Sequence, residues 1–144
     1  MATTATDLSL KDAAGTARTF TLLTPASGYG QIAEWVYKVG PIATVFPRLT
    51  AMARNVINTQ RVRTSGGRQV AQEKNVSIKL VVPSSYMDTV TGLTNVGSAM
   101  EFTTNVRIPA DFPEDKKPDA VAFHKEAVAN ALIQAMFKDG TPAS

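Results

Sequence analysis

Apolar and polar residues alternate along several segments of the chain, which is the pattern of β-strands with one buried face. The clearest segment is residues 75–83, NVSIKLVVP. One face of this segment would carry Val76, Ile78, Leu80 and Val82, and the other would carry Asn75, Ser77, Lys79 and Val81. Residues 100–109, MEFTTNVRIP, repeat the pattern, with Phe102, Val106 and Ile108 on the core face and Glu101, Thr103, Asn105 and Arg107 opposite. Both segments predict strands of a sheet that is covered on one side only.

Four further strands are predicted upstream. Residues 7–11 and 18–23 flank an Ala-Ala-Gly-Thr turn and predict a β-hairpin. Residues 32–40 predict a third strand that ends at a glycine. Residues 48–64 alternate in their first half, which places Arg48, Thr50 and Arg54 on one side of a fourth strand. Residues 84–99 are polar and contain glycine, and predict a loop that is long for a hairpin, as functional or mobile loops often are.

The pattern changes period near the C-terminus. Asp119 can cap a helix that runs to about Lys138, with Gly140 as its stop signal. An apolar stripe along this helix would hold Val121, Val128, Leu132 and Met136. The predicted fold class is therefore α+β, in one domain of residues 1–144. It comprises an N-terminal hairpin at about 7–24, an antiparallel sheet of about six strands reaching residue 109, and a C-terminal helix at about 119–138.

This arrangement leaves apolar surface to be covered. A helix of about 20 residues is about 30 Å long and 10 Å wide, which is too narrow for the apolar face of six strands. Burial of apolar surface is worth about 25 cal/mol per Å², and large exposed apolar patches usually mark an interface. We therefore expect an oligomer in which each subunit lends its helix to the sheet of another.

Composition limits the possible chemistry. The chain of 144 residues is 44% hydrophobic and 19% charged, as expected for one soluble globular domain. It has no cysteine and one histidine, so we expect no disulfide, no metal site and no cofactor. No apolar run approaches the length that crosses a bilayer, and the start MATTATDLSL does not resemble a signal peptide, so we expect the chain to remain in a cytoplasm.

Positive charge is concentrated in the middle of the chain. Between residues 48 and 79, the only acidic residue is Glu73, and the basic residues are Arg48, Arg54, Arg61, Arg63, Arg68, Lys74 and Lys79. Such clustering is typical of a surface that binds a polyanion, but it is also typical of a solvated face. Charge alone leaves both interpretations open.

No catalytic constellation is recognisable, so we expect a protein that is not an enzyme. The segment SGGR at 65–68 has neither the spacing nor the lysine of a phosphate-binding loop. Trp35 and Tyr37 could stack on bases, but aromatic residues in strands more often belong to a core. The acidic residues between 111 and 119 are expected to form a solvated loop rather than a cation site, and His124 is expected on a helix surface.

Four short strings resemble strings that occur in the same order in the coat proteins of single-stranded RNA bacteriophages (leviviruses). They are IAEW at 32–35, VSIKLVVP at 76–83, NVRIP at 105–109 and AMFKDGTP at 135–142. The N-terminal hairpin agrees in pattern but not in residues. Members of that family usually continue into a second short helix, whereas this sequence ends at Ser144, so we expect a rearranged helical layer.

The resemblance implies an obligate homodimer in which two sheets join edge to edge and each C-terminal helix crosses onto the partner's sheet. Dimers of that family close into small icosahedral shells, here expected with T=3 symmetry, whose inner sheet face packages single-stranded genomic RNA. The loop before the last strand contacts neighbouring dimers, and the residues at matching positions are Thr89, Gly92 and Asn95. The location implied is the virion, assembled in the cytoplasm of a bacterial host, with no membrane partner.

Alternation and resemblance together predict an RNA-binding face. It would consist of Arg48, Thr50, Arg54, Asn75, Ser77, Lys79, Thr103, Asn105 and Arg107. Coat proteins of the family also act as translational repressors, through an aromatic residue that stacks on an unpaired RNA base. Glu101 stands at that position here, so we expect mainly electrostatic, weakly selective binding, and the repressor role stays open. The alternative is a dimeric single-stranded nucleic-acid-binding protein that forms no shell.

Overall fold

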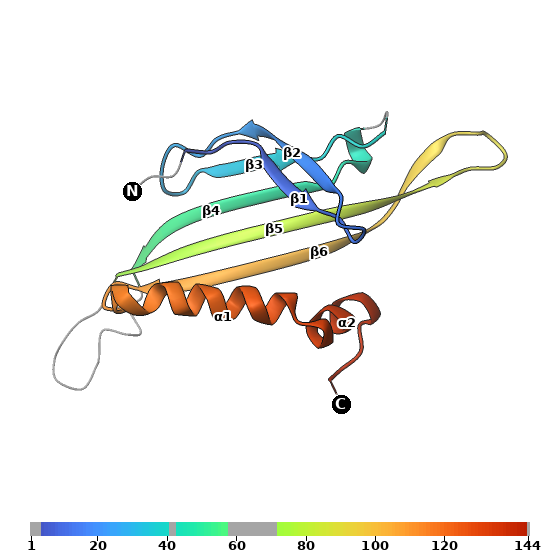
Figure 1. Ribbon diagram of the computed structural model, residues 1–144. Coiled ribbons are helices and arrows are strands. Elements are labelled where there is room, and N and C mark those ends of the chain that lie inside the picture. Colours follow the sequence, from blue (N-terminus) through green and yellow to red (C-terminus); the bar gives the residue numbers. More distant parts are fainter. Residues whose placement is uncertain (1–3, 41–42, 58–71, 144) are drawn as a thin grey trace. The chain divides into compact units, whose positions relative to one another are not determined.

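The computed structural model describes residues 4–40, 43–57 and 72–143 (Figure 1). The chain divides into two compact units, a sheet unit, Met1–Pro109, and a helical unit, Ala110–Ser144. Residues 58–64 of the predicted fourth strand and the basic residues Arg61, Arg63 and Arg68 lie outside the described residues.

The sheet unit is an antiparallel meander whose strands lie side by side in the order of the sequence (Figure 1). Its strands are β1 Leu8–Lys11, β2 Ala17–Thr24, β3 Ile32–Val36, β4 Arg48–Ile57, β5 Gln72–Met87 and β6 Thr94–Pro109. The predicted N-terminal hairpin and the six-stranded antiparallel sheet are thus confirmed. A short 3-10 helix, Ala43–Val45, precedes β4.

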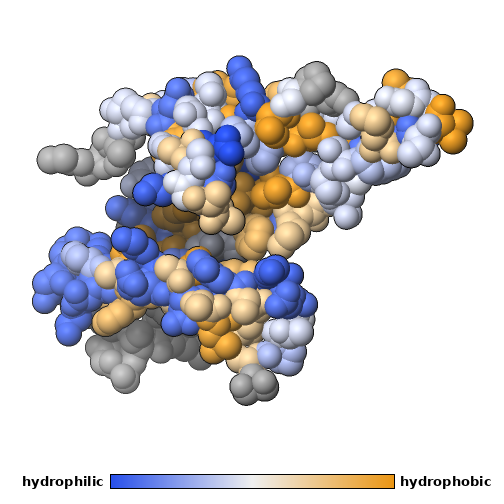
Figure 2. Space-filling view, turned by 45° about the vertical axis from the view of Figure 1, so that its right-hand side comes forward, coloured by the Kyte–Doolittle hydropathy of each residue, from blue (hydrophilic) through white to orange (hydrophobic). Residues whose placement is uncertain are grey.

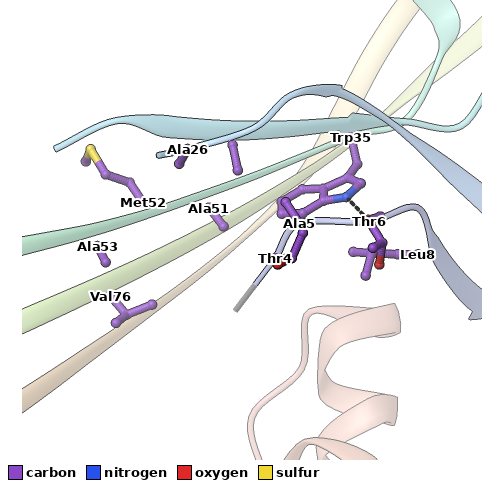
Figure 3. A pocket seen from close by; sticks show the side chains of 11 residues that line it. Thr4, Ala5, Thr6, Leu8, Ala26, Trp35, Ala51, Met52, Ala53 and Val76 are labelled. Carbon is purple, nitrogen blue, oxygen red and sulfur yellow. Dashed lines mark hydrogen bonds between the residues drawn. The ribbon is translucent and has the colours of Figure 1, made fainter. Parts of the chain in front are cut away.

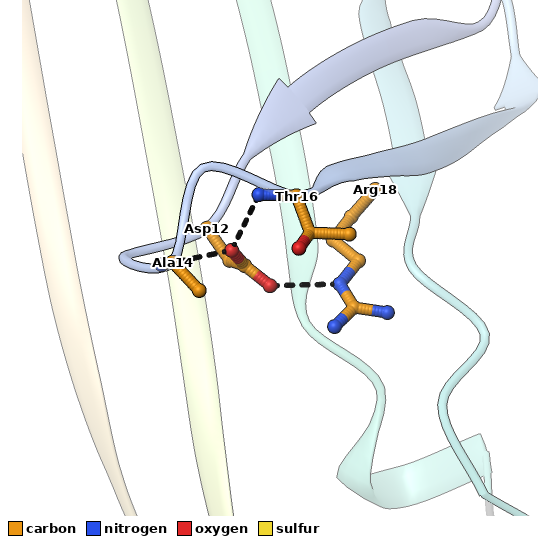
Figure 4. Close-up of polar contacts among 4 residues, drawn as sticks. All are labelled: Asp12, Ala14, Thr16 and Arg18. Atoms are coloured by element: carbon orange, nitrogen blue, oxygen red, sulfur yellow. Dashed lines mark hydrogen bonds and ion pairs between the residues drawn. The ribbon is translucent and has the colours of Figure 1, made fainter.

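The first hairpin is closed by a network around Asp12 (Figure 4). Its Oδ1 accepts hydrogen bonds from the backbone N–H groups of Ala14 at 3.0 Å and Thr16 at 2.9 Å. Its Oδ2 accepts one from Arg18 Nε at 2.9 Å. The Thr16 N–H, followed by Arg18, lowers the pKa of the Asp12 carboxyl below its ordinary value. Gly15 supplies the left-handed backbone of the turn, at φ 82°.

The predicted long loop at 84–99 is wrong. Strands β5 and β6 remain paired from Pro83↔Ala99 outward to Met87↔Thr94, and only Asp88–Leu93 form the turn. Asp88 Oδ1 accepts from Val90 N at 2.8 Å, Asp88 N donates to Leu93 O at 2.8 Å, and Gly92 has φ 69°. The same turn chemistry therefore closes both hairpins. The sequence pattern did not predict strands at residues 84–87 and 94–99, because these residues are mostly exposed and therefore show no alternation of buried and exposed positions.

The core of the sheet unit is small. Among the described residues, Phe20, Ala33, Trp35 and Val36 are the buried apolar ones. Trp35 donates its indole N–H to Thr6 O at 2.8 Å, and Phe20 stacks on Tyr37 with ring centroids 5.6 Å apart. The core interpretation of Trp35 is confirmed, and Tyr37 packs against that core. Farther along the apolar face, Ile78 and Val106 each remain 39% exposed.

The helical unit contains two helices instead of the one helix predicted at 119–138. A 3-10 turn, Glu114–Lys116, leads into α1 Lys117–Ala129, and α2 spans Ala131–Asp139. Asn130 separates them with extended backbone, at ψ 136°, and its side chain accepts from Leu132 N at 3.0 Å. Asparagine favours this capping role over a helix interior, which explains the break. Neither helix of the described chain is long and apolar enough to cross a membrane.

The helix boundaries also change the predicted cap and stripe. Asp119 lies in the first turn of α1 and is not its cap, because the helix begins at Lys117. The break divides the predicted stripe, with Val121 and Val128 on α1 and Leu132 and Met136 on α2. Gly140 ends α2 in the left-handed conformation, at φ 67°, as its stop signal predicted.

Candidate nucleic-acid interface

The strand register brings the predicted RNA-binding residues onto one face of the sheet. Thr50 lies opposite Lys79 and Arg54 opposite Asn75, while Lys79, Ser77 and Asn75 lie opposite Thr103, Asn105 and Arg107. We call this surface the polar sheet face, defined by Arg48, Thr50, Arg54, Asn75, Ser77, Lys79, Thr103, Asn105 and Arg107. The alternation predicted this shared face, whereas the role of these residues in RNA binding stays a prediction.

Most cations of the polar sheet face form ion pairs with acidic neighbours. Arg48 Nη1 lies 2.7 Å from Glu34 Oε1, and Lys79 Nζ lies 3.4 Å from Glu101 Oε2. Arg107 Nη2 lies 3.1 Å from an oxygen of the buried Glu73. These carboxylates offset three of the four positive charges on the polar sheet face. The local excess over this face is therefore smaller than the sequence suggested.

Sequence reasoning missed Glu34 as a member of this surface. It belongs to β3 and lies opposite Thr50, beside the row that carries Arg48. The signal for it was available, since strict alternation around Trp35 places Glu34 on the polar side. This alternation could predict the contact between Glu34 and Arg48 only once β3 was known to pair with β4, because that strand pairing brings the two side chains together.

Arg54 differs from the other cations of this face. Its side chain is exposed, and within the described part of the chain no ion pair holds it. It lies opposite Asn75, whose Oδ1 is buried without a hydrogen-bond partner. Because its guanidinium is exposed and has no ion pair among the described residues, Arg54 can bind a phosphate, whereas the buried Asn75 Oδ1 is not open to a ligand. This end of the face has the most capacity left for a ligand.

Hydroxyl and amide groups complete the polar sheet face. Ser77 Oγ donates to Asn105 Oδ1 at 2.9 Å, which leaves the amide NH₂ of Asn105 as its donor to a ligand. Thr103 is exposed and neighbours Lys79 across the strand pair. Glu101, opposite Val81, lies on the same face and adds a carboxylate to it. The arrangement suits contacts to phosphates and sugar hydroxyls better than stacking.

The sheet unit also holds an apolar pocket that the sequence did not predict (Figure 3). Its volume is about 430 Å³. N-terminal residues 4–8, the loop after β2, and strands β3 to β5 contribute its lining: Thr4, Ala5, Thr6, Leu8, Ala26, Ala33, Trp35, Ala51, Met52, Ala53 and Val76. The indole of Trp35 forms one wall and is fixed there by its bond to Thr6 O. Such a lining can accept an apolar side chain.

The predicted contact loop is a compact turn with apolar residues at its tip. Thr89 and Gly92 lie in the turn Asp88–Leu93, whereas Asn95 lies in β6 opposite Tyr86 and not in a loop. Val90 is 91% exposed and Leu93 64%, and Figure 2 shows the apolar atoms at the tip of this hairpin. Sequence reasoning missed these two residues because it treated the whole segment as polar.

Neither helix contains a buried residue. Val121, Val128 and Leu132 are exposed, Met136 is half-buried, and the exposed Phe123 was not predicted as an interface residue. In the acidic segment, Glu114 forms an ion pair with Lys117. In the described part of the chain, no group of three or more His, Cys, Asp or Glu side chains is arranged to hold a metal ion.

Comparison with known proteins gives a similarity of fold. No protein-family model and no curated protein sequence matches the chain. Among solved structures, the virus-like particle of bacteriophage NT-214 matches with a TM-score of 0.72 and 17% identity over 96% of both chains. The virus-like particle of Beihai levi-like virus 21 matches with a TM-score of 0.73 and 16% identity, over 96% of this chain and 97% of that chain. The bacteriophage GA capsid protein matches with a TM-score of 0.57 and 21% identity, over 93% of this chain and 94% of that chain.

The resemblance to coat proteins of RNA phages is thus confirmed at the level of the fold. The match extends over nearly the whole chain and nearly the whole of each neighbour, so it includes both the sheet and the helices. At these identities the likeness establishes the architecture, and function has to be argued from the surfaces described above.

Proposed function

We propose that this chain is a coat protein of a single-stranded RNA phage, which forms dimers that close into a small icosahedral shell around RNA. The observation that carries the proposal is the fold match over more than nine-tenths of both chains to proteins solved as virus-like particles and as a capsid. Such a protein would occur in the virion, after assembly in the cytoplasm of a bacterial host.

Dimerisation is supported by apolar surface in both units. Ile78 and Val106 remain substantially exposed on the apolar side of the sheet, and the exposed helical side chains would gain by burial. In the proposed dimer, two sheets join edge to edge and the helices of each copy lie on the other copy's sheet. The proposed interface residues on those helices are Val121, Val128, Leu132 and Met136. The pocket beside Trp35 offers a place for an apolar side chain of the second copy.

Packaging of RNA is proposed for the polar sheet face, turned to the shell interior. Its cations would neutralise phosphates, and its Asn, Ser and Thr side chains would bond to bases or 2′-hydroxyls. The ion pairs with Glu34, Glu73 and Glu101 favour modest, weakly selective binding. Because Glu101 replaces a stacking aromatic, the proposal includes packaging and stops short of repression through a specific RNA hairpin.

Contacts between dimers are proposed for the β5–β6 turn. Thr89 and Gly92 in the turn, and Asn95 beside it in β6, would lie near the symmetry axes of a T=3 shell. The apolar Val90 and Leu93 at the tip would be buried against neighbouring copies, because such exposure on an isolated turn is unfavourable.

The proposal is tested by expressing the full chain in bacteria and treating the lysate with nuclease before sedimentation. We expect a fast-sedimenting species that retains RNA protected from the nuclease. Dimers that bind RNA but leave it open to digestion would contradict the coat function. They would indicate instead a nucleic-acid-binding protein that forms no shell.

A further inference from the structure

The turn between β5 and β6 is held by the side chain and the backbone of Asp88. Its Oδ1 accepts hydrogen bonds from Val90 N at 2.8 Å and from Thr91 N at 3.4 Å. Its backbone N–H donates to Leu93 O, and its backbone carbonyl accepts from Gly92 N, both at 2.8 Å. The Val90 N–H, followed by that of Thr91, lowers the pKa of the Asp88 carboxyl below its ordinary value. One residue thus fixes the backbone of the whole turn.

The tip of this turn combines apolar side chains with a single charge. Val90 and Leu93 are exposed there (Figure 2). Between residues 84 and 99, Asp88 is the only charged residue. A carboxylate beside an apolar contact has to be partly desolvated when the contact forms, and this desolvation is unfavourable. A compensating advantage of Asp88 is that its hydrogen bonds hold the tip in one shape.

The turn lies at the end of a two-stranded arm. Strand β4 pairs with β5 only as far as Val81, whereas β5 and β6 stay paired from Ser85↔Val96 to Met87↔Thr94. The ends of β5 and β6 therefore extend past the rest of the sheet (Figure 1). Pairing between the two strands positions the tip, and the hydrogen bonds of the turn determine the shape of the tip.

We propose that Asp88 is a positioning residue for shell assembly, whose carboxylate holds Val90 and Leu93 in the arrangement that contacts a second dimer of this chain. This inference rests on the proposed coat function, in which the β5–β6 turn contacts neighbouring dimers. It adds the residue that prepares the turn for that contact. Asp88 acts through the backbone of the turn and does not have to touch the neighbouring dimer.

The advantage of a fixed turn lies in the entropy of association. A flexible turn would lose backbone freedom when it packs against a neighbour, and this loss would weaken the contact. The hydrogen bonds of Asp88 remove part of that freedom before association. Because each dimer contains two copies of the turn, the effect counts twice for every dimer that joins a shell.

The first hairpin of the same chain offers a matched control. Asp12 closes that turn in the same way, with Ala14 N and Thr16 N as donors to its Oδ1, and Gly15 is the residue with left-handed backbone. The turn sequence DAAGT contains no large apolar side chain. Loss of either aspartate should therefore disturb a turn of similar structure, but only loss of Asp88 should weaken contacts between dimers.

The test compares Asp88→Ala with Asp12→Ala in the full chain. Dimers of each variant are mixed with RNA at increasing protein concentration, and light scattering gives the concentration at which half of the dimers form shells. Asp88→Ala should raise this concentration at least about tenfold, because both turns of each dimer lose hydrogen bonds to a carboxylate. Asp12→Ala should change it by less than about threefold. Sedimentation should show intact dimers for both variants.

Two further measurements separate the shape of the turn from its charge. Asp88→Asn keeps a side-chain oxygen that can accept from Val90 N, so it should recover most of the assembly that Asp88→Ala loses. Gly92→Ala and Gly15→Ala each place a methyl group on left-handed backbone, at φ 69° and 82°, where no other atom lies within 4 Å. Gly92→Ala should impair assembly and Gly15→Ala should not. This glycine pair decides the question if Asp88→Ala yields no folded dimer.

The outcomes distinguish the role of Asp88 from the coat function. If Asp88→Ala assembles like the unmodified protein, or if Asp12→Ala is equally impaired, the positioning role is overturned while the coat function stands. If Asp88→Asn is as defective as Asp88→Ala, the charge itself is required, and positioning through hydrogen bonds of the turn is overturned. Unmodified protein that forms no shells would overturn the coat function and the role of Asp88 with it.

Discussion

The RNA-binding role of the polar sheet face is best tested by changing its charges singly. Arg54 has no ion pair among the described residues, whereas Lys79 is paired with Glu101 at 3.4 Å. Arg54→Ala should therefore remove a cation available to phosphate. Glu101→Gln should release Lys79 from its carboxylate and strengthen binding. Lys79→Ala should weaken binding by less than Arg54→Ala, because Glu101 already offsets part of the Lys79 charge.

The size of these effects follows from counterion release. For single-stranded RNA, log K falls with log salt at a slope of about −0.7 per neutralised phosphate. Arg54→Ala should make that slope shallower by about 0.7, and Glu101→Gln should make it steeper by up to about 0.7. Between 50 and 200 mM salt, one phosphate contact then changes K by a factor of about 2.6.

The assay is a salt titration of RNA binding by dimers held below their assembly concentration. Lys125→Ala on α1 is the matched control, because it removes one exposed positive charge from the helical unit and leaves the sheet unchanged. If Lys125→Ala makes the slope shallower while Arg54→Ala and Lys79→Ala leave it unchanged, RNA binds elsewhere and the polar sheet face has been misassigned.

Three further predictions concern dimerisation, assembly and pH. Leu132→Asp should abolish the soluble dimer, because an unpaired charge would enter an apolar interface. In sedimentation, a well-folded monomer would show that folding does not need the partner. An unchanged dimer would show that Leu132 does not lie at the interface. Val90→Ser combined with Leu93→Ser should leave dimers folded but block or alter closed particles, and normal particles in electron microscopy would remove the assembly role of the turn. The pKa of Asp12 is lowered from its ordinary 3.8, so its stabilisation is fully present above that value and is lost as pH falls through the lower folded-state pKa. Asp12→Asn should remove this part of the acid dependence in unfolding titrations, and an unchanged dependence would contradict the role of its charge.

Sequence reasoning succeeded where one physical constraint dominates. In β4, β5 and β6 apolar side chains alternate with polar ones, so the period of two fixes which side chains share a face. Arg54, Asn75 and Arg107 could be grouped this way without coordinates, and the register places them in one row. The hairpin at Asp12 was visible for a similar reason, since its glycine-containing turn separates two short runs of strand-forming residues.

Sequence reasoning failed where a strand has no buried face and where one side chain can play more than one structural role. Residues 84–87 and 94–99 are mostly exposed on both faces, so their strands are held by backbone pairing and by the Asp88 turn, which leaves no hydrophobic pattern. The sequence predicted one continuous helix through Asn130, although this side chain can cap the next helix. The pairing of Glu34 with Arg48 depends on strand neighbours, which periodicity within one strand cannot reveal.

Electron cryomicroscopy of the unmodified protein purified from bacteria tests the proposed function most directly. We expect uniform closed shells with density for RNA inside, in which the polar sheet face lines the interior and each pair of copies shares one continuous sheet. Dimers or monomers that form no shell at any concentration or salt tested, or shells whose polar sheet face lies on the outside, would contradict it.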